Sequence, residues 1–227
     1  YSNKDLLLKQ IKSISTMSPK EKRNALLAEK LIKNLIIRNF EAIYCPTAAE
    51  AVTKISNMIP DGSSVTWGGS MTIRGMGLTQ ELHKRNLTVL DRDEAIDRDE
   101  AQRIYRQAFS CDYYLSSANA ISEDGIIVNI DGNGNRVAAI TFGPQHVILV
   151  IGLNKVAQDI NAALARARST ASPINAARFD ISTPCLKDGV CHNCNSPESI
   201  CNYVHFIRNS HPKGRHIVVL VGEDLGF

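Results

Sequence analysis

The chain has 227 residues, of which 44% are hydrophobic, enough to build the core of one large α/β domain. Its formal net charge of +3 is weak and its basic residues are interleaved with acidic ones, which argues against nucleic acid as a partner. The longest apolar run, Val147–Leu153, is too short to cross a bilayer, so we expect no membrane span and a cytoplasmic location with free thiols.

The first 40 residues are expected to form a helical extension of the domain. Residues 4–14 make a short amphipathic segment. The sequence Ser18-Pro19-Lys20-Glu21 is a capping box with proline at the first helical position, and it predicts a second helix that runs to Phe40. Apolar residues recur with helical period in this second helix, so one side of it should pack on the domain or on a second subunit, as in a homodimer.

Beyond residue 40, predicted strands alternate with predicted helices. The expected strands cover residues 41–45, 64–67, 87–90, 113–116, 126–130, 137–142, 147–151 and 217–221. The expected helices cover residues 47–59, a segment that ends near 84, and then 94–111, 154–169 and 197–208. This alternation predicts one α/β domain over residues 1–227, with a mostly parallel open sheet, helices on both faces and an antiparallel insertion near 126–142.

A glycine-rich loop directly follows the predicted strand 64–67 and opens a helix. Glycines let backbone N–H groups approach a ligand closely, and hydroxyl side chains add donors for an anion. Arg74 is placed to clamp a phosphate or a carboxylate. The loop matches neither the nucleoside-triphosphate P-loop nor the dinucleotide fingerprint, and a tight turn whose glycines serve packing is the alternative. The anion-binding residues that we predict here are Gly68, Gly69, Ser70, Met71, Thr72, Arg74 and Gly75.

Two adjacent acids, Glu123 and Asp124, lie near the end of a predicted strand. Open α/β sheets place their ligands at such ends, and a carboxylate there can serve as a catalytic general base or nucleophile. A purely structural role is the equal alternative. The run 131–135 is also a good hairpin turn, since Asp-Gly and Asn-Gly tolerate positive φ. The ligand contacts that we predict along this stretch are Asn119, Asn129, Asp131, Asn135 and Arg136.

A third loop follows the apolar strand 147–151 and contains Lys155. We expect this lysine on the first turn of a helix, where its charge opposes the helix dipole. That misfit favours a ligand-facing side chain, and a solvated surface position is the alternative. The predicted ligand set of this loop is Gly152, Asn154 and Lys155.

Four of the six cysteines lie in one Cys-rich segment, residues 184–202. Their pattern is C-x5-C-x2-C-x6-C, and thiolates at this spacing can converge on one metal ion or cluster. The pattern matches neither zinc-ribbon pairs nor the ferredoxin motif. Zinc, an iron–sulfur cluster, a redox pair at Cys191 and Cys194, and plain buried thiols therefore all stay open. The candidate metal ligands are Cys185, Cys191, Cys194 and Cys201.

Several motifs together resemble the lactate-utilisation (LUD) domain family. They are residues 66–70 (TWGGS), 118–125 (ANAISEDG), 128–138 (VNIDGNGNRVA) and 152–155 (GLNK), and the tail segments 191–202 and 218–226 match one branch of the family. The resemblance implies a fold like that of ribose-5-phosphate isomerase, glucosamine-6-phosphate deaminase and coenzyme A transferases. It also implies a link to bacterial lactate oxidation, in which some members are fused to iron–sulfur modules whose ferredoxin-type motifs this chain lacks.

A narrower similarity concerns residues 122–126, which resemble the Ser-Glu-Asn-Gly motif bearing the nucleophilic glutamate of coenzyme A transferases. Asp124 replaces the asparagine of that motif. A second negative charge beside Glu123 would oppose attack by its carboxylate on a thioester.

The loops lead us to expect a protein that binds a small anionic metabolite or phosphate-bearing ligand in a cleft. The segment 68–75 would hold the anion and Lys155 would neutralise it, in support of lactate-type organic-acid oxidation. Acyl-coenzyme A transfer through Glu123 is one alternative. The other is an accessory subunit that holds a metal through its cysteines and docks a partner, such as another subunit of a lactate-oxidation complex, through its N-terminal helices.

Overall fold

The computed structural model describes residues 17–227 of the chain. The helix expected at residues 4–14 lies outside the described residues. Helix α2 (Pro19–Ile37) begins with the predicted capping box, in which the Ser18 hydroxyl accepts from the backbone N–H of Glu21 and the Glu21 carboxylate accepts from that of Ser18. Within residues 17–227, no helix is both long and apolar enough to cross a membrane.

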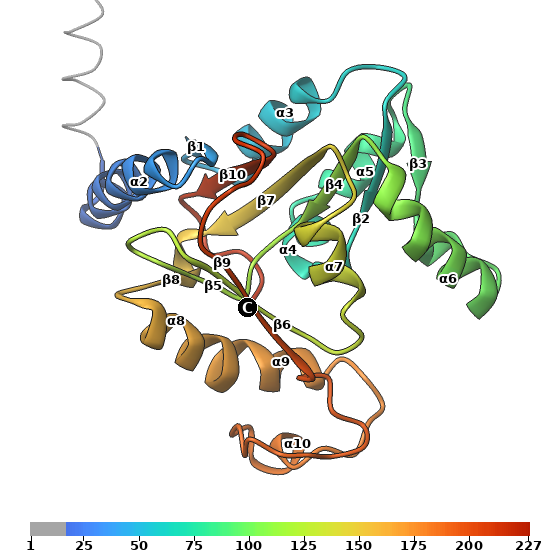
Figure 1. Ribbon diagram of the computed structural model, residues 1–227. Coiled ribbons are helices and arrows are strands. Elements are labelled where there is room, and N and C mark those ends of the chain that lie inside the picture. Colours follow the sequence, from blue (N-terminus) through green and yellow to red (C-terminus); the bar gives the residue numbers. More distant parts are fainter. Residues whose placement is uncertain (1–16) are drawn as a thin grey trace, which may run out of the picture.

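Six parallel strands form the main sheet (Figure 1). Strands buried on both faces need continuous apolar runs, and the runs predicted as strands at these positions agree with the structure to within one residue. The predicted α/β class with a mostly parallel open sheet is therefore confirmed. The spatial order is β1 (Glu41–Cys45), β10 (His216–Val221), β7 (His146–Gly152), β4 (Tyr113–Ser116), β2 (Ser64–Trp67) and β3 (Thr88–Leu90).

Helices cover both faces of this sheet, as predicted. Ile55 and Leu82 are fully buried on one face, and Leu31 and Ile140 are fully buried on the other. Burial of such side chains is the main term that holds the layers together. The helices on the first face are α3 (Ala48–Met58), α4 (Met71–Gly75) and α5 (Leu78–His83), and those on the second are α2 and α7 (Asn135–Thr141).

The charged segment predicted as one helix over 94–111 is divided into three pieces. The break falls before the second piece because the Asp97 side chain accepts a hydrogen bond from the backbone N–H of Glu100 at 2.8 Å and so starts a new helix. The pieces are η1 (Arg92–Glu94), α6 (Arg98–Gln107) and η2 (Ala108–Ser110). No residue of α6 is buried, in keeping with a solvated helix.

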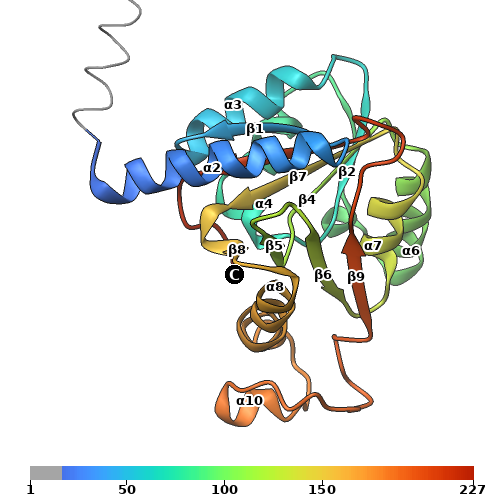
Figure 2. The same cartoon turned by 60° about the vertical axis from the view of Figure 1, so that its left-hand side comes forward.

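A second, smaller sheet lies beside the main sheet (Figure 2). Its strands in spatial order are β8 (Val156–Ala157), β5 (Ala120–Ser122), β6 (Ile127–Asp131) and β9 (Tyr203–Ile207). One face contributes Ile121 and Ile127 to the core of the main sheet, and the other packs through Val128 on a helical layer. That layer runs through α8 (Ile160–Arg166), the π-helical turn η4 (Ala167–Ala171) and α9 (Ser172–Ala176), where a single helix over 154–169 was expected.

The strand predicted at 137–142 is wrong, because this run forms α7. The Asp131 carboxylate accepts from the backbone N–H of Asn133 at 3.2 Å and of Gly134 at 2.9 Å, and Gly134 has a φ of 79°. The chain therefore turns from β6 into a helix rather than into a hairpin. A short apolar run does not by itself distinguish the two outcomes.

The helix predicted at 197–208 is also wrong. The Ser196 hydroxyl does not cap a helix but donates to the carbonyl oxygen of Ser182 at 3.2 Å. The run Tyr203–Ile207, rich in β-branched and aromatic residues, forms β9 and pairs antiparallel with β6. The antiparallel pair β6–β9 thus joins segments far apart in the sequence, which a local pattern does not reveal.

Candidate functional site

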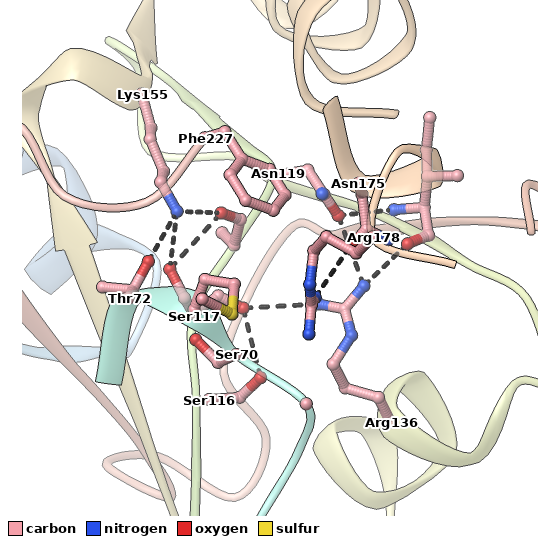
Figure 3. A pocket seen from close by; sticks show the side chains of 14 residues that line it. Ser70, Thr72, Ser116, Ser117, Asn119, Arg136, Lys155, Asn175, Arg178 and Phe227 are labelled. Atoms are coloured by element: carbon pink, nitrogen blue, oxygen red, sulfur yellow. Dashed lines mark hydrogen bonds between the residues drawn. The ribbon is translucent and has the colours of Figure 1, made fainter. Parts of the chain in front are cut away.

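A cavity of about 70 Å³ lies where β2, β4 and β7 end (Figure 3). The chain leaves β2 toward α4 on one face of the sheet and leaves β4 toward β5 on the other, so a crevice opens between these two strands. Open α/β folds bind their ligands at such a point. The lining residues are Gly69, Ser70, Met71, Thr72, Ser116, Ser117, Ala118, Asn119, Ile130, Arg136, Lys155, Asn175, Arg178 and Phe227.

Lys155 is the most unusual side chain of the cavity. It lies on η3 (Leu153–Lys155), the turn that follows β7, and only 2% of it is exposed. Its Nζ donates to the hydroxyl oxygens of Thr72 at 2.9 Å and Ser117 at 3.0 Å, and to the carbonyl oxygen of Ala118 at 3.1 Å (Figure 3). The buried position rules out the solvated-surface alternative for this lysine.

In the described part of the chain, Lys155 forms no ion pair with a carboxylate. Among the ion pairs of residues 17–227, none includes Lys155 or Arg178, and no aspartate or glutamate side chain lines the cavity. Burial, with smaller contributions from the positive charges of Arg166 and Arg136, lowers the pKa of Lys155 to about 7. A buried ammonium without a counter-ion is costly, and a bound anion would remove that cost.

The two hydroxyls bonded to Lys155 differ in what they can donate. Thr72 and Ser117 each use a lone pair to accept from the lysine, and the Thr72 O–H stays free to donate to another group. The Ser117 O–H donates a long bond to the Ala118 carbonyl oxygen at 3.4 Å and can turn from it to a better acceptor. An adjacent positive charge polarises such a hydroxyl and strengthens the bond that it donates. An anion in the cavity would therefore meet the Thr72 hydroxyl directly and the Ser117 hydroxyl after this turn.

Arg136 is the second cation of the cavity, and its guanidinium is occupied by its neighbours. It donates to the Asp131 carboxylate at 3.1 Å, to the Asn129 side-chain oxygen at 2.7 Å and to the Ile130 carbonyl at 2.7 Å. These contacts fasten the start of α7 to β6. Gly68 leaves room for this side chain, because a Cβ there would lie 3.1 Å from two carbons of Arg136.

Arg178, just after α9, is the third cation. It donates to the Asn175 side-chain oxygen at 2.9 Å, and its pKa is lowered by burial and by the nearby charges of Arg74 and Arg92. An outer cavity of about 330 Å³ shares Arg178, Asn175 and Arg136 with the inner one. A ligand held at Lys155 thus has room to extend outward along an arginine-lined wall.

The predicted ligand residues fall into three groups. Those that line the inner cavity are Gly69, Ser70, Met71, Thr72, Asn119, Arg136 and Lys155. Asp131 and Asn135 line the outer cavity. The remaining residues have structural contacts: Arg74 forms an ion pair with Asp93, Gly75 faces open space, and Asn129 supports Arg136.

Gly152 and Asn154 hold the last residues of the chain. The Asn154 side-chain oxygen accepts from the backbone N–H of Leu225 at 3.1 Å. A Cβ on Gly152 would lie 2.8 Å from that same nitrogen and 2.9 Å from the Glu223 carbonyl oxygen. The segment 222–227 can therefore cross the end of β7 closely, which places Phe227 at the cavity.

Glu123 and Asp124 do not line the cavity. The Glu123 carboxylate accepts from Lys30 of α2 at 2.6 Å, and the Asp124 carboxylate accepts from Arg38 at 2.6 Å. The backbone oxygen of Glu123 also accepts from the Asn34 side chain at 2.8 Å. The turn between β5 and β6 therefore fastens α2 to the domain, and the structure gives the two predicted catalytic acids this contact rather than access to the cavity.

The four clustered cysteines all line a different cavity, of about 150 Å³, which α9 lines through Ser172 and Pro173. Within residues 17–227, no group of three or more histidine, cysteine or acidic side chains is close enough to hold a single metal ion. Cys45 and Cys111 are buried elsewhere in the core, and burial raises the pKa of Cys111 to about 11.

Sequence reasoning missed the contribution of α9 and the residues after it. Asn175 and Arg178 follow no glycine-rich loop and belong to no recognisable motif. They reach the cavity because the π-helical turn η4 carries the chain from α8 into α9 beside β6. Ser116 and Ser117 carried a usable signal, since Ser116 ends a predicted strand and Ser117 follows it directly.

Comparison with known proteins agrees with this architecture. The structure of a DUF162 family protein from Deinococcus radiodurans superimposes with a TM-score of 0.53 at 12% identity, over 87% of this chain and 97% of that chain, which shows a shared fold. No curated protein matches the sequence.

Two further solved structures are similar over part of the chain. Ribose 5 phosphate isomerase A from Neisseria gonorrhoeae has a TM-score of 0.34 at 12% identity, over 51% of this chain and 56% of that chain. The eIF2B delta of Chaetomium thermophilum has a TM-score of 0.31 at 17% identity, over 71% and 76% of the two chains. The LUD domain model matches residues 28–221, and the chain therefore belongs to the LUD domain family.

Proposed function

We propose that this protein binds a small organic anion, with a carboxylate or phosphate group, in the cavity around Lys155. Membership of the LUD domain family favours a role in lactate utilisation, so a lactate-type organic acid is the first ligand to consider. The observation that carries the proposal is the ammonium group of Lys155, which is 2% exposed, lies at the end of three parallel strands and has no carboxylate partner among residues 17–227.

The charge of the cavity supports an anionic ligand. Lys155, Arg136 and Arg178 line it, and Arg136 is the one of these three that has a carboxylate partner within the described chain. Of the other two, Lys155 is buried and Arg178 is exposed at the rim. A charge shielded from water, as that of Lys155 is, attracts an anion more strongly than a charge at the surface does.

The binding mode follows from the hydrogen bonds. The hydroxyls of Thr72 and Ser117 donate to the carboxylate or phosphate oxygens, while Lys155 holds both hydroxyls in place and supplies the positive field. The rest of the ligand points to the outer cavity, toward Asn175 and Arg178. Lys155 already donates three hydrogen bonds, which favours an orienting role for it over a nucleophilic one.

Calorimetry tests the proposal directly. Lactate, inorganic phosphate and ribose 5-phosphate are titrated into the full chain and into Thr72→Val and Ser117→Ala variants. We expect each substitution to weaken binding of the best ligand about tenfold, because one charge-assisted hydrogen bond contributes roughly 1.5 kcal/mol. Thr79→Val, at a buried threonine of α5 outside the cavity, is the matched control and should bind like the unchanged chain.

Two results would contradict the proposal. One is the absence of any heat with all three anions at millimolar concentration. The other is equal affinity in Thr72→Val, Ser117→Ala and Thr79→Val, which would place the bound anion away from Lys155.

A further inference from the structure

A long irregular segment carries the four clustered cysteines and lacks a core of its own. Residues 177–202 contain a single short helix, α10 (Cys185–Asp188), and most of their side chains are exposed. Loops of this length without regular structure are uncommon in compact domains and are usually functional. Segments that bury so little apolar surface need another device, such as a metal centre, to hold one conformation.

All four thiols nevertheless meet at one cavity of about 150 Å³. Cys185 begins α10, Gly189 ends it with a φ of 78°, and Cys191 and Cys194 follow in a loop. Asn193, between these two cysteines, has a φ of 49°, a left-handed conformation that turns the chain back on itself. Cys201 comes from the other side, two residues before β9.

All four cysteines are partly accessible. Cys185, Cys191 and Cys194 are half-buried and Cys201 is exposed, and all four line the same cavity. The thiol of Cys185 is within 3.3 Å of the Thr183 hydroxyl, a contact that orients it.

The dimensions of the cavity favour a cluster over a single ion. A tetrahedral zinc ion at about 2.3 Å from each sulfur holds the four sulfurs about 3.8 Å apart and leaves no space between them. In residues 17–227, no such compact group of ligands exists. An iron–sulfur cluster brings its own sulfide ions and several irons, so it spans a wider gap between four cysteine thiolates.

The walls of the cavity suit such a group. Pro173, Ile130 and Val204 form an apolar side, which excludes water from a cluster, and Arg168 supplies a positive charge. No acidic side chain lines the cavity to compete with the thiolates or to repel a negatively charged cluster.

We propose that Cys185, Cys191, Cys194 and Cys201 ligate an iron–sulfur cluster that fastens the segment 177–202 to α9 and β9. The cysteines lose their thiol protons when they bind iron. Ile130 lines both this cavity and the inner anion cavity, and α9 carries residues of both, so the cluster also holds the wall that bears Asn175. This site is independent of the anion site in its chemistry and in its test.

The test measures iron, zinc and acid-labile sulfide per chain after anaerobic purification and reconstitution of the full chain with ferrous iron and sulfide. We expect iron and sulfide in equal amounts, about two to four of each, and a visible absorption that dithionite bleaches. Cys191→Ser and Cys201→Ser should lose most of the iron and sulfide. Cys45→Ala, at a buried cysteine far from the segment, is the matched control and should retain them.

Three results would overturn the proposal. They are about one zinc per chain without sulfide, a Cys191–Cys194 disulfide in a chain that takes up no iron, and iron and sulfide contents in Cys191→Ser that equal those of the unchanged chain. Circular dichroism of each variant shows whether it has folded. The iron, zinc and sulfide contents of the unchanged chain test the proposal without any variant, so the test holds even if a variant fails to fold.

Discussion

Two cations of the same site, the buried Lys155 and the half-buried Arg136, have different roles, and their hydrogen bonds distinguish them. Arg136 forms an ion pair with Asp131 and donates its other hydrogen bonds to backbone and side-chain amide oxygens. These bonds fasten α7 to β6. Lys155 has only neutral acceptors. A charge that the fold does not neutralise is costly to keep, and such costs concentrate at functional sites.

Replacement of Lys155 by methionine should therefore raise the free energy of unfolding relative to the unchanged chain as pH falls from about 10 to about 7. The folded-state pKa of about 7 lies below the unfolded value of about 10.4, so the unfolded chain binds the proton more tightly and burial of the lysine costs free energy throughout this range. At about 1.4 kcal/mol per pH unit, the gain of the variant over the unchanged chain should grow by roughly 4 kcal/mol between pH 10 and pH 7.

Urea unfolding of both proteins at pH 7 and pH 10 measures this difference. Loss of the hydrogen bonds of Lys155 lowers the stability of the variant by about 1 kcal/mol each. The neutral amine at pH 10 has two N–H donors and the ammonium form, half populated near pH 7, has three, so this loss differs by less than about 1 kcal/mol between the two pH values. Lys84→Met, at an exposed lysine, is the control and should change the free energy of unfolding by less than about 0.5 kcal/mol. A Lys155→Met variant whose advantage is the same at both pH values would show that this lysine is not desolvated.

At the scale of elements, the site depends on chain segments that cross strand ends at close range. The turn between β5 and β6 is fastened to α2 by two ion pairs, which explains the adjacent acids without assigning them chemistry. The last residues of the chain cross the end of β7 above Gly152, where a Cβ would meet backbone atoms of Glu223 and Leu225. Only glycine leaves the space for this approach.

Replacement of Gly152 by alanine should displace the segment 222–227. We expect a loss of about 1–3 kcal/mol in the free energy of unfolding, the usual cost of forcing extra atoms into packed structure, together with weaker anion binding. Gly75→Ala, where a Cβ would meet nothing within 4 Å, is the matched control and should be neutral or slightly stabilising. Chemical denaturation measures both variants, and equal stability of Gly152→Ala and Gly75→Ala would contradict the packing described here.

At the scale of the whole molecule, α9 contributes to two cavities. One is lined by cations at the ends of the parallel strands, and the other is lined by four cysteines together with Ile130 and Val204 of the second sheet. Figure 2 shows the segment that carries α10 extending away from both sheets, below α8. Its attachment to the domain therefore rests on few contacts, and these include Arg168 with Asn193 and Asn202 with the Gly132 carbonyl at 3.0 Å.

Loss of the proposed cluster should loosen this part of the molecule and leave the rest intact. In hydrogen exchange measured by mass spectrometry, we expect amides of residues 182–202 to exchange at least about tenfold faster after removal of iron, because the segment buries little surface without it. Amides of α2 and β1 serve as the internal reference and should not change. Equal exchange of 182–202 before and after iron removal would show that the cysteines do not hold the segment.

The strength of a local signal explains which elements could be predicted. The strands of the main sheet are continuous apolar runs, and Ser18 and Thr47 cap their helices as their sequences indicate. The runs 137–142 and 203–207 are short and apolar in part, so their form depends on partners. Residues 137–141 lie in a helix because Asp131 and Gly134 turn the chain out of β6. Residues 203–207 form a strand because they pair with the edge of β6.

The sequence by itself determined the α/β class, the main strands and the loop residues around Thr72 and Lys155, because parallel strands bring their carboxyl ends together wherever they lie in the chain. Only the tertiary structure decided that Lys155 is buried without a counter-ion, that Arg178 joins it and that Glu123 is turned to α2. Burial and pairing are relations between distant residues, and no local pattern encodes them. The convergence of four thiols on one cavity is of the same kind, since α9 and β9 must be in place before Cys201 faces the others.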